Sequence, residues 1–489
     1  MKNVMIVGTQ FGDEGKGKAI DLLGSGLVDG YAPGVTVRAQ GGNNAGHTTV
    51  VDGVKTITHL VPSAMQNPEM IGIMGNGMVL DLNVLVDEIT KLEKMGCSLQ
   101  DRLYISERAN VIMPWHPYLD GEKDKTQGIG TTRKGIGPSY TDKIARHGIR
   151  LCNFKDGTLQ EKIEKNIERL ELEDHFHPEG VYEQQVDLFA CIRNNVRNIQ
   201  EVMDSIMNNE NPPSFLFEAA QGTMLDIDFG TYPTVTSSNS VAGGCLTGTG
   251  VGPDFIHEVW GIVKAYITRV GNGPFPTEIG GSESEKYCAK GLECDIKYEL
   301  ETYGIPFEEV MKGDEEEVKY DHQHKNIIKL VNSKDPMEKN VGLRLVGEEY
   351  GATTKRPRRI GWMDGVILRH AVAVNGLNYI VLTKLDVLSG LPELNICTRY
   401  EREHPKTDNG NEAEIAEVHN YPPASQAWMR DCKPHYERMD GWPDDIIGIR
   451  KFEKLPIECQ NYVKRIEEIA GVPVKMIGVG PDREQTIVR

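Results

Sequence analysis

Residues 4–18 read VMIVGTQFGDEGKGK, an apolar run that passes directly into a glycine-rich one. The run Val4 to Gly8 predicts a short buried strand, and Ala19 to Leu23 predicts a helix after the glycines. Strand, glycine-rich loop and helix in this order are typical of a phosphate site, because small residues let backbone N–H groups close on phosphate oxygens at a helix N-terminus. The stretch therefore indicates an α/β fold with a P-loop-like nucleotide site.

This loop departs from a standard phosphate loop in two ways. Position 19 is Ala, so the hydroxyl that would hold magnesium is absent, and an acid, Asp13, lies inside the loop. A carboxylate beside phosphate is repelled unless it binds a metal or takes up a proton. The alternative is a tight strand-to-helix turn with two solvated lysines, Lys16 and Lys18. The loop alone leaves both interpretations open.

Short apolar runs recur along the chain at Phe215 to Phe217, Tyr379 to Leu382 and Val474 to Ile477. Each ends in Gly, Asp or a Gly-Pro pair, which predicts strands whose loops gather at one edge of a sheet. Residues Leu159 to Leu172 and Val186 to Met207 are apolar at every third or fourth position and predict two long amphipathic helices. We expect a large, mostly parallel central sheet flanked by helices.

We see no internal repeat and expect one domain over residues 1–489. Residues 280–349 differ in texture, with the acidic run Asp314 to Glu317 and the nearby His322 and His324. We interpret 280–349 as an insertion within this domain. The two histidines are more easily explained as a solvated face than as ligands.

The composition limits the function class. A formal net charge of −18 argues against a broad surface for nucleic acid or anionic lipid, because phosphate backbones are held chiefly by Lys and Arg. The nine cysteines form no CxxC pair, which predicts reduced, structural thiols. The first residues are too short for a secretory signal and no long apolar run follows, so we expect a cytoplasmic protein.

The run Thr383-Lys384-Leu385-Asp386 resembles the guanine-reading tetrad of GTP-binding proteins. A carboxylate there accepts two hydrogen bonds from N1–H and the 2-amino group of guanine, and adenine offers no such pair. Alone, the tetrad could equally be an exposed strand end. Beside a phosphate loop, it favours GTP.

Two further runs carry groups suited to anions. Residues 40–48, QGGNNAGHT, form a polar, glycine-rich loop with one imidazole, that of His47. Such a histidine is usually structural, but beside a phosphate loop it could donate a proton to a transferring phosphoryl group. Residues 353–359, TTKRPRR, place four cations around a proline in an acidic chain. They are either a solvated charge run or a pocket that binds carboxylate and phosphate.

Long stretches of the chain, in order, resemble signatures of the adenylosuccinate synthetase family. They begin at Gly8 (GTQFGDEGKGK), Arg38 (RAQGGNNAGHT), Thr131 (TTRKGIGPSYTDKIARHGIR), Phe217 (FEAAQGTMLDIDFGTYPTVTSSNS), Lys264 (KAYITRVGNGPFPTE), Gly351 (GATTKRPRRIGWMD), Leu382 (LTKLDVLSG) and Gly478 (GVGPDRE). They run from residue 4 to the C-terminus and leave only 280–349 outside.

The resemblance implies a GTP-dependent ligase of purine biosynthesis that joins L-aspartate to inosine monophosphate (IMP). Asp13 would remove the N1 proton of IMP, so that O6 attacks the γ-phosphate of GTP. His47 would stabilise or protonate the transferred phosphate, and aspartate would then displace it from C6. Mg²⁺ would be held by Asp13 and the carbonyl of Gly46.

The same resemblance implies the ligand contacts. The GTP residues would be Gly12, Glu14, Gly15, Lys16, Gly17, Lys18, Gly46, Thr48, Arg358, Lys384, Leu385, Asp386, Gly478, Val479 and Gly480. The IMP residues would be Asp13, Lys16, Asn44, His47, Thr132, Arg146, Gln221, Thr236 and Arg356. The aspartate residues would be Ala352, Thr353, Thr354, Arg356 and Arg358. Arg146 would come from a second subunit, which implies a homodimer.

Three departures from the family pattern bear on loop mobility and aspartate affinity. Arg133-Lys134 replaces a common Gly-Arg, Lys355 replaces a Gly, and 280–349 lengthens the chain. Two rivals remain. The viral sister enzyme 2-aminoadenylosuccinate synthetase acts on dGMP and lacks the acid matching Asp13, and a GTP-hydrolysing switch would leave His47 and the arginine run unexplained.

Overall fold

The computed structural model describes residues 2–51, 54–127, 132–312, 315–351, 355–402 and 417–489. Contacts divide the chain into two compact units. The first comprises residues 1–8, 15–228 and 235–260, and the second comprises residues 9–14, 229–234 and 261–489. The prediction of a single domain with an insertion at 280–349 stays a prediction.

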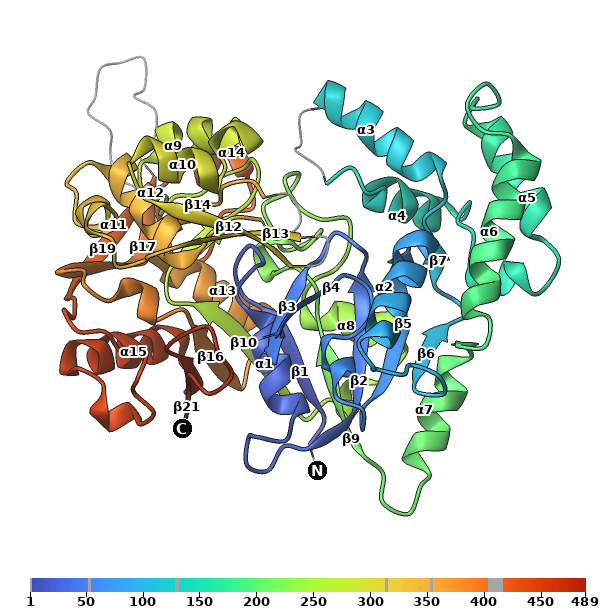
Figure 1. Ribbon diagram of the computed structural model, residues 1–489, viewed down its shortest axis with the longest axis horizontal. Helices are drawn as coiled ribbons and strands as arrows, with labels where there is room; N and C mark the ends of the chain where they lie inside the picture. Colours follow the sequence, from blue (N-terminus) through green and yellow to red (C-terminus); the bar gives the residue numbers. More distant parts are fainter. Residues whose placement is uncertain (1, 52–53, 128–131, 313–314, 352–354, 403–416) are drawn as a thin grey trace. The chain divides into compact units, whose positions relative to one another are not determined.

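The first unit contains a run of parallel strands in the order β1-β9-β2-β5-β6-β8, with β7 paired to β5. Figure 1 labels β1, β9, β2, β5, β6 and β7. The strands are β1 (Val4–Gly8), β2 (Pro33–Gly41), β5 (Ile71–Leu80), β6 (Leu103–Ser106), β7 (Asn110–Val111), β8 (Val196–Arg197) and β9 (Ser214–Glu218). A separate hairpin joins β3 (His47–Val51) to β4 (Val54–Thr58). The predicted strands at Val4 to Gly8 and Phe215 to Phe217 are confirmed, and they pair with each other in register Val4 to Leu216.

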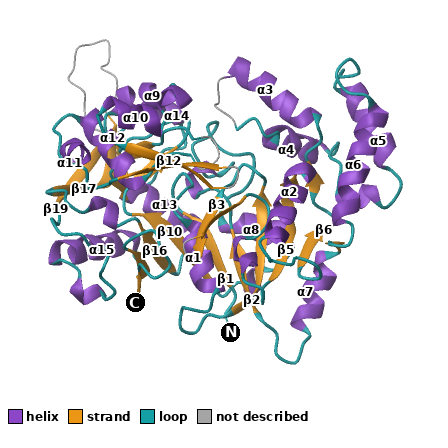
Figure 2. Cartoon of the chain, viewed as in Figure 1, coloured by secondary structure: helices purple, strands orange, loops and turns teal. Residues whose placement is uncertain are grey.

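Helices flank these strands, as Figure 2 shows in purple against orange. They are α1 (Lys16–Gly24), α2 (Leu82–Lys94), α3 (Trp115–Gln127), α4 (Ile136–Ala145), α5 (Leu159–Arg169), α6 (Pro178–Ile192), α7 (Ile199–Met207) and α8 (Ala242–Thr249). Helix α8 approaches the sheet closely because Gly248 faces Gly75 and Gly77, where a Cβ atom on either strand glycine would fall within 2.7 Å of its backbone. Close packing at this point requires glycine.

The prediction of one helix over Val186 to Met207 is wrong. Helix α6 ends at Ile192, and the chain then forms the two-residue strand β8, which pairs with β6. Asn198 begins α7 as its N-cap, where its side chain accepts a hydrogen bond from Gln200 N at 3.3 Å. Buried residues recur every three or four positions through the break, at Ile192, Val196, Ile199 and Met203, so the sequence pattern does not reveal it. The helix predicted at Leu159 to Leu172 is confirmed as α5.

The second unit contains a run of mostly parallel strands in the order β21-β20-β16-β10, to which β10 contributes from Gly261 onward. They are β10 (Glu258–Lys264), β16 (Tyr379–Thr383), β20 (Val474–Gly478) and the antiparallel β21 (Thr486–Val488). Strands β16 and β20 confirm the two remaining strand predictions and pair in parallel. The carboxyl ends of both therefore lie at one edge of the sheet.

Smaller sheets and the remaining helices surround these strands in the second unit. The strands are β11 (Ile267–Arg269), β12 (Phe307–Lys312), β13 (Glu315–Tyr320), β14 (Arg359–Gly361), β15 (Met363–Asp364), β17 (Glu393–Arg402), β18 (Glu417–His419) and β19 (Lys433–Asp440). The helices are α9 (Gly281–Ala289), α10 (Ile296–Thr302), α11 (Lys325–Val331), α12 (Pro336–Gly347), α13 (Gly365–Asn375), α14 (Gln426–Asp431) and α15 (Ile457–Ala470).

Residues 280–349 contribute to the core of the second unit. Leu300, Ile327 and Leu345 from this segment are buried in the same hydrophobic cluster as Ile380 of β16 and Tyr462 of α15. The β12–β13 hairpin is more exposed, with the side chain of Met311 68% accessible. The helices of this segment therefore contribute more to the core of the second unit than the β12–β13 hairpin does.

No helix in the described ranges is long and apolar enough to cross a membrane. All nine cysteines are described, and every one is free of a disulfide.

Candidate functional site

The glycine-rich turn after β1 is shaped by an unusual run of left-handed backbone. Gly12, Asp13 and Gly15 have φ values of 81°, 58° and 90°. The buried carboxylate of Glu14 accepts hydrogen bonds from Gly12 N at 2.9 Å and Gln10 N at 3.0 Å. Asp13 is a non-glycine residue in a conformation that costs free energy, a kind of strain that clusters at functional sites.

In the second unit, the Asp13 carboxylate meets a buried arginine. Arg358 Nε lies 3.1 Å from Asp13 Oδ2, and the Asp13 side chain is 35% exposed. On its other side, Arg358 Nη1 donates to Glu349 Oε2 at 2.6 Å. Arg358 is thus held between two carboxylates, and Asp13 remains partly open to a ligand.

The predicted guanine-reading tetrad follows β16 in the same unit. Thr383 Oγ1 donates to the carbonyl of Glu14 at 2.6 Å, which ties the tetrad to the glycine-rich turn. Leu385 N donates to the carbonyl of Gly478 at 3.2 Å, which joins the tetrad to the end of β20. Lys384 has φ 56°, and Asp386 begins a short 3₁₀ turn at Asp386–Leu388. The structure therefore brings together the turn, the tetrad and the predicted residues Gly478 to Gly480.

In the first unit, His47 forms a buried pair with Glu218. His47 Nδ1 donates to Glu218 Oε1, and Glu218 also accepts from Ser63 N at 2.9 Å and from the Ser63 hydroxyl. Burial lowers the pKa of His47 below its ordinary value, although Glu218 opposes this. Burial alone would raise the pKa of Glu218, but His47 and Arg38 beside it bring that pKa to about 2. At neutral pH the pair is a neutral imidazole and a carboxylate.

The loop before His47 is fixed by contacts from several elements of the first unit. Arg38 Nη2 donates to the Gly42 carbonyl at 3.2 Å, and the ring of His59 lies 2.7 Å from the Ala45 carbonyl through Nδ1. Gln221 Nε2 donates to Asn44 Oδ1 at 3.2 Å. Asn44, Gly46 and His47 are therefore presented on a restrained backbone.

Lys16 joins this loop to the end of the sheet in the first unit. It begins α1, is buried, and donates through Nζ to the carbonyl of Gln221. Gly17 follows it in the helix and is buried, and Lys18 is half-buried. The structure therefore places the predicted residues Lys16, Asn44 and Gln221 in one group. Asn44 belongs to the same loop as His47, three positions before it.

Other predicted residues lie outside these groups. Thr132 and Arg146 are exposed, and Thr236 and Arg356 are half-buried. Within the described part of the chain, none of these four side chains hydrogen-bonds to the glycine-rich turn and tetrad of the second unit, or to the His47 loop and its partners in the first unit. Ala352, Thr353 and Thr354 lie outside the described residues, as does the side chain of Thr48. Their predicted contacts remain predictions.

Among the described residues, no group of three or more His, Cys, Asp or Glu side chains is placed to hold a metal ion. Mg²⁺ does not require such a group, because it commonly binds one or two carboxylates together with substrate phosphates. The partly exposed Asp13 and the half-buried Gly46 fit that donor chemistry.

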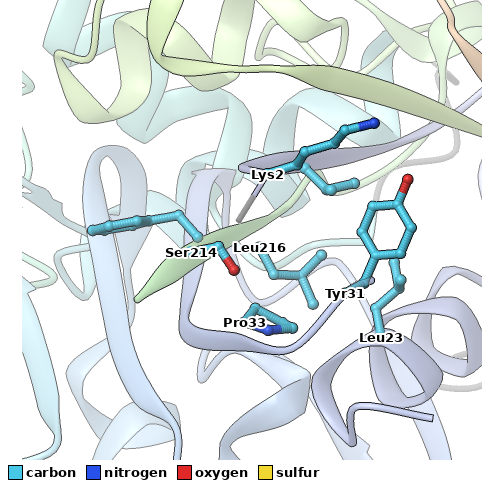
Figure 3. Close-up of a pocket in the computed structure, with 8 residues that line it drawn as sticks. Lys2, Leu23, Tyr31, Pro33, Ser214 and Leu216 are labelled. Atoms are coloured by element: carbon cyan, nitrogen blue, oxygen red, sulfur yellow. The ribbon is translucent and has the colours of Figure 1, made fainter. Parts of the chain in front are cut away.

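A small pocket lies at the other end of the strands in the first unit (Figure 3). Its lining includes Val4 of β1, Pro33 of β2 and Ser214 of β9, each the first residue of its strand. The polar loops described above follow the last residues of these parallel strands. The pocket is therefore at the opposite sheet edge from Lys16, His47 and Gln221.

Two buried carboxylates, Glu218 and Glu349, hold predicted site residues and were missing from the prediction. Glu218 is the last residue of β9, and strand ends at this edge carried the other polar groups. Glu349 stands two positions before the GATTKRPRR run. The signals in the sequence were therefore positional: Glu218 is the second residue of the stretch that begins at Phe217, and Glu349 lies just before the stretch that begins at Gly351.

The model of the adenylosuccinate synthetase family matches residues 5–487. The chain is 42% identical to the adenylosuccinate synthetase of Halothermothrix orenii over 500 aligned residues, covering 100% of this chain and 99% of that one. It is 40% identical to that of Geobacter sulfurreducens over 500 residues, covering 100% and 98%.

Solved structures agree with these matches. The structure of fully ligated adenylosuccinate synthetase from Plasmodium falciparum is similar with a TM-score of 0.80 and 32% identity, covering 100% of both chains. The succinoaminodeoxyadenylate synthetase of cyanophage S-2L, bound to dGMP and dATP, shares the fold at a TM-score of 0.54 and 19% identity, covering 100% of this chain and 95% of that one. From the family match along the full length and the identity to these relatives, the chain belongs to the adenylosuccinate synthetase family.

Proposed function

We propose that this chain is a GTP-dependent ligase that makes adenylosuccinate from IMP and L-aspartate, with release of GDP and phosphate. This is the reaction of its family and the first committed step of AMP synthesis. The observation that carries the proposal is Asp13, a partly exposed carboxylate on a strained turn beside Arg358. A turn that only connected a strand to a helix would have no need for an acid in this conformation.

The reaction has two steps, phosphorylation of O6 of IMP and displacement of that phosphate by aspartate. Asp13 takes the N1 proton of IMP, so that electron density moves to O6 and O6 attacks the γ-phosphorus of GTP. The bond from that phosphorus to the bridging oxygen breaks and GDP leaves. The amine of aspartate then attacks C6, the C6–O bond breaks and phosphate departs. Phosphorylation converts a poor leaving group into a good one.

His47 and Arg358 act on the charge that develops during transfer. A ring that donates Nδ1–H to Glu218 has Nε2 left to receive a proton, and the carboxylate stabilises the imidazolium that results. That proton can then be shared with the phosphoryl oxygens. Arg358, fixed by Glu349, supplies a permanent positive charge for the phosphates of GTP.

The ligand contacts that the sequence predicts stand as part of this proposal. Lys384, Asp386 and Gly478 to Gly480 frame guanine, and Lys16, Asn44, Thr132, Gln221 and Thr236 hold IMP. Thr353, Thr354 and Arg356 bind aspartate. Asp13 and the carbonyl of Gly46 would hold Mg²⁺, which supplies neutralisation of phosphate charge.

We also propose a homodimer in which Arg146 completes the IMP site of the other subunit. Arg146 ends α4 with φ 68°, and its side chain is exposed, without a hydrogen-bond or ion-pair partner among the described residues. Its neighbour Ile144 is 76% exposed, which is unusual for a large apolar side chain. A partner subunit would account for both. A cytoplasmic location stays a prediction from the sequence.

A coupled assay for GDP release tests the function directly. The purified chain is supplied with GTP and one of IMP, AMP, GMP or dGMP, each with and without aspartate. We expect GDP release only with IMP and aspartate together, with adenylosuccinate as product. Release with GTP alone would indicate a hydrolysing switch, and release with dGMP would indicate the sister reaction.

A further inference from the structure

Glu349 lies at the centre of a buried cluster of charged side chains in the second unit. Its Oε1 accepts a hydrogen bond from Lys264 Nζ at 2.8 Å and another from the hydroxyl of Tyr266. Its Oε2 accepts from Arg358 Nη1 at 2.6 Å, and Lys384 Nζ lies 3.7 Å from Oε1. We call these five residues the Glu349 cluster.

The cluster holds more positive than negative charge. Lys264, Arg358 and Lys384 share the single carboxylate of Glu349, and Lys264 and Glu349 are completely buried. Burial lowers the pKa of Lys264 to about 8, against the attraction of Glu349. Burial would raise the pKa of Glu349, but the lysines and Arg358 hold it well below its usual range. Glu349 is therefore anionic throughout the neutral range, and its removal would leave three cations facing each other.

The cations belong to different parts of the proposed GTP site. Lys384 is the second residue of the tetrad, and its Nζ also donates to the carbonyl of Gly347. Arg358 belongs to the basic run at 353–359 and contacts Asp13 through its Nε. The main chain reinforces the link, because Arg358 N donates to the carbonyl of Glu349 at 2.9 Å. One carboxylate therefore touches a residue on the base side and a residue on the phosphate side.

We propose that Glu349 is a positioning residue that fixes Lys384 and Arg358 together, so that recognition of guanine and transfer of the phosphoryl group depend on the same carboxylate. The inference rests on the proposed function, in which Lys384 packs on guanine and Arg358 reaches the phosphates. Without Glu349, Lys384 keeps the Gly347 carbonyl, and Arg358 turns its full charge to Asp13.

The test compares Glu349→Gln with a matched control, Glu299→Gln. Glu299 is also completely buried in the second unit, and it accepts hydrogen bonds from Arg344 Nη1 and the hydroxyl of Tyr350. It contacts neither Lys384 nor Arg358 through its side chain. The double variant Lys264→Met/Glu349→Gln removes one cation together with the carboxylate, so the net charge of the Glu349 cluster is the same as in the unmodified chain. The kinetic constants kcat and the KM values for GTP and IMP are measured for each.

For Glu349→Gln we expect kcat to fall about 10-fold or more and KM for GTP to rise about 10-fold, since small misplacements of catalytic groups have effects of this size or larger. KM for IMP should change less than about threefold. The double variant should show the same losses, because it keeps the cation pair but not its anchor. The control should stay within about threefold of the unmodified chain in every constant.

The inference is overturned if a folded Glu349→Gln variant keeps both constants within about threefold, or if Glu299→Gln loses as much. Unfolding of both Glu349 variants beside a folded control would also count against it, because Glu349 would then hold the fold and not the ligand residues. An unmodified chain that forms no adenylosuccinate contradicts the proposed function itself, whatever the variants do.

Discussion

At the scale of single residues, Asp13 has a left-handed backbone, so a substitution there changes the backbone strain as well as the side chain. Replacement by Ala removes the base and also leaves a β-carbon in a left-handed backbone, which residues other than glycine, asparagine and aspartate rarely adopt. Asp101 offers a matched control, since it has φ 55° and an exposed side chain far along the chain from the glycine-rich turn. Strain alone would affect both variants similarly.

For Asp13→Ala we expect kcat to fall at least about 100-fold, because removal of a general base typically costs that much. Binding of GTP, followed by calorimetry, should persist, and Asp101→Ala should keep near-normal turnover. Near-normal turnover of Asp13→Ala would remove Asp13 from the reaction.

The buried carboxylate of Glu218 decides how readily His47 can carry a proton. His47 is neutral at neutral pH in this structure because burial lowers its pKa, and the negative charge of Glu218 opposes that shift. Replacing Glu218 with Gln removes the opposing charge. The pKa of His47 should then fall further, and the protonated fraction should disappear at a lower pH.

For Glu218→Gln we therefore expect kcat to fall by about 100-fold near pH 7 and the alkaline decline of kcat to begin at lower pH. The measurement is kcat from pH 5.5 to 9 at saturating substrates. Glu88→Gln is the control, because Glu88 is also buried in the first unit but accepts from the main chain at His59 and Leu60. A pH profile identical to that of the unmodified chain would show that His47 donates no proton.

The sequence was sufficient for residues whose chemistry is local, and insufficient for those defined by a distant partner. The glycines around Asp13 predicted a tight turn, and the turn is there. Glu218 is paired with His47, 171 positions away, and Glu349 accepts a hydrogen bond from Lys264, 85 positions away. A glutamate at a strand or helix end is common, so only the folded contacts distinguish these two.

At the scale of elements, strands were easier to predict than the break between α6 and α7. Buried parallel strands such as Val4–Gly8 and Tyr379–Thr383 are continuous apolar runs bounded by glycine or charge. The break at β8 keeps the apolar spacing of the flanking helices, and the pairing with β6 that stabilises it comes from a segment about ninety positions earlier. Periodicity alone does not report such a pairing.

The β12–β13 hairpin is the part of residues 280–349 that we expect to be dispensable. Phe307, Val318 and Tyr320 pack against the core, and the Tyr320 hydroxyl donates to the Leu345 carbonyl at 2.6 Å. Beyond the Glu308–Lys319 pair, the hairpin has exposed side chains such as that of Met311. We predict that replacing residues 309–318 with an Asn-Gly turn leaves kcat and KM within about twofold and lowers Tm by a few degrees at most.

The kcat and KM values and the Tm of the chain with the shortened hairpin are measured by the kinetic assay and by thermal unfolding. Removal of the Lys297–Glu309 ion pair, whose side chains are partly exposed, should contribute little to the change in Tm. A shortened chain that keeps its Tm but loses turnover would show that the hairpin has a role in catalysis.

At the scale of the whole molecule, the Arg146 side chain of a single chain is exposed and hydrogen-bonds to none of the other predicted IMP residues that the structure describes. A closed dimer with twofold symmetry uses the same surface of both subunits, so each site would receive the arginine of the other. In such a dimer, an Arg146→Leu subunit keeps its own Asp13. Its site is complete only when the other subunit of the dimer has Arg146 intact. An Asp13→Ala subunit can provide that arginine, although its own site is inactive.

We predict that either variant alone is nearly inactive and that mixing them restores activity. With free exchange at equal amounts, about half of the dimers are hybrids, and each hybrid has one complete site, so activity should approach about a quarter of the unmodified value. The measurement is adenylosuccinate formation after exchange has been verified with differently tagged subunits. Each variant is also mixed with itself as a control. If verified hybrids recover no activity, Arg146 acts within its own chain, and the exposed side chains of Arg146 and Ile144 need another explanation.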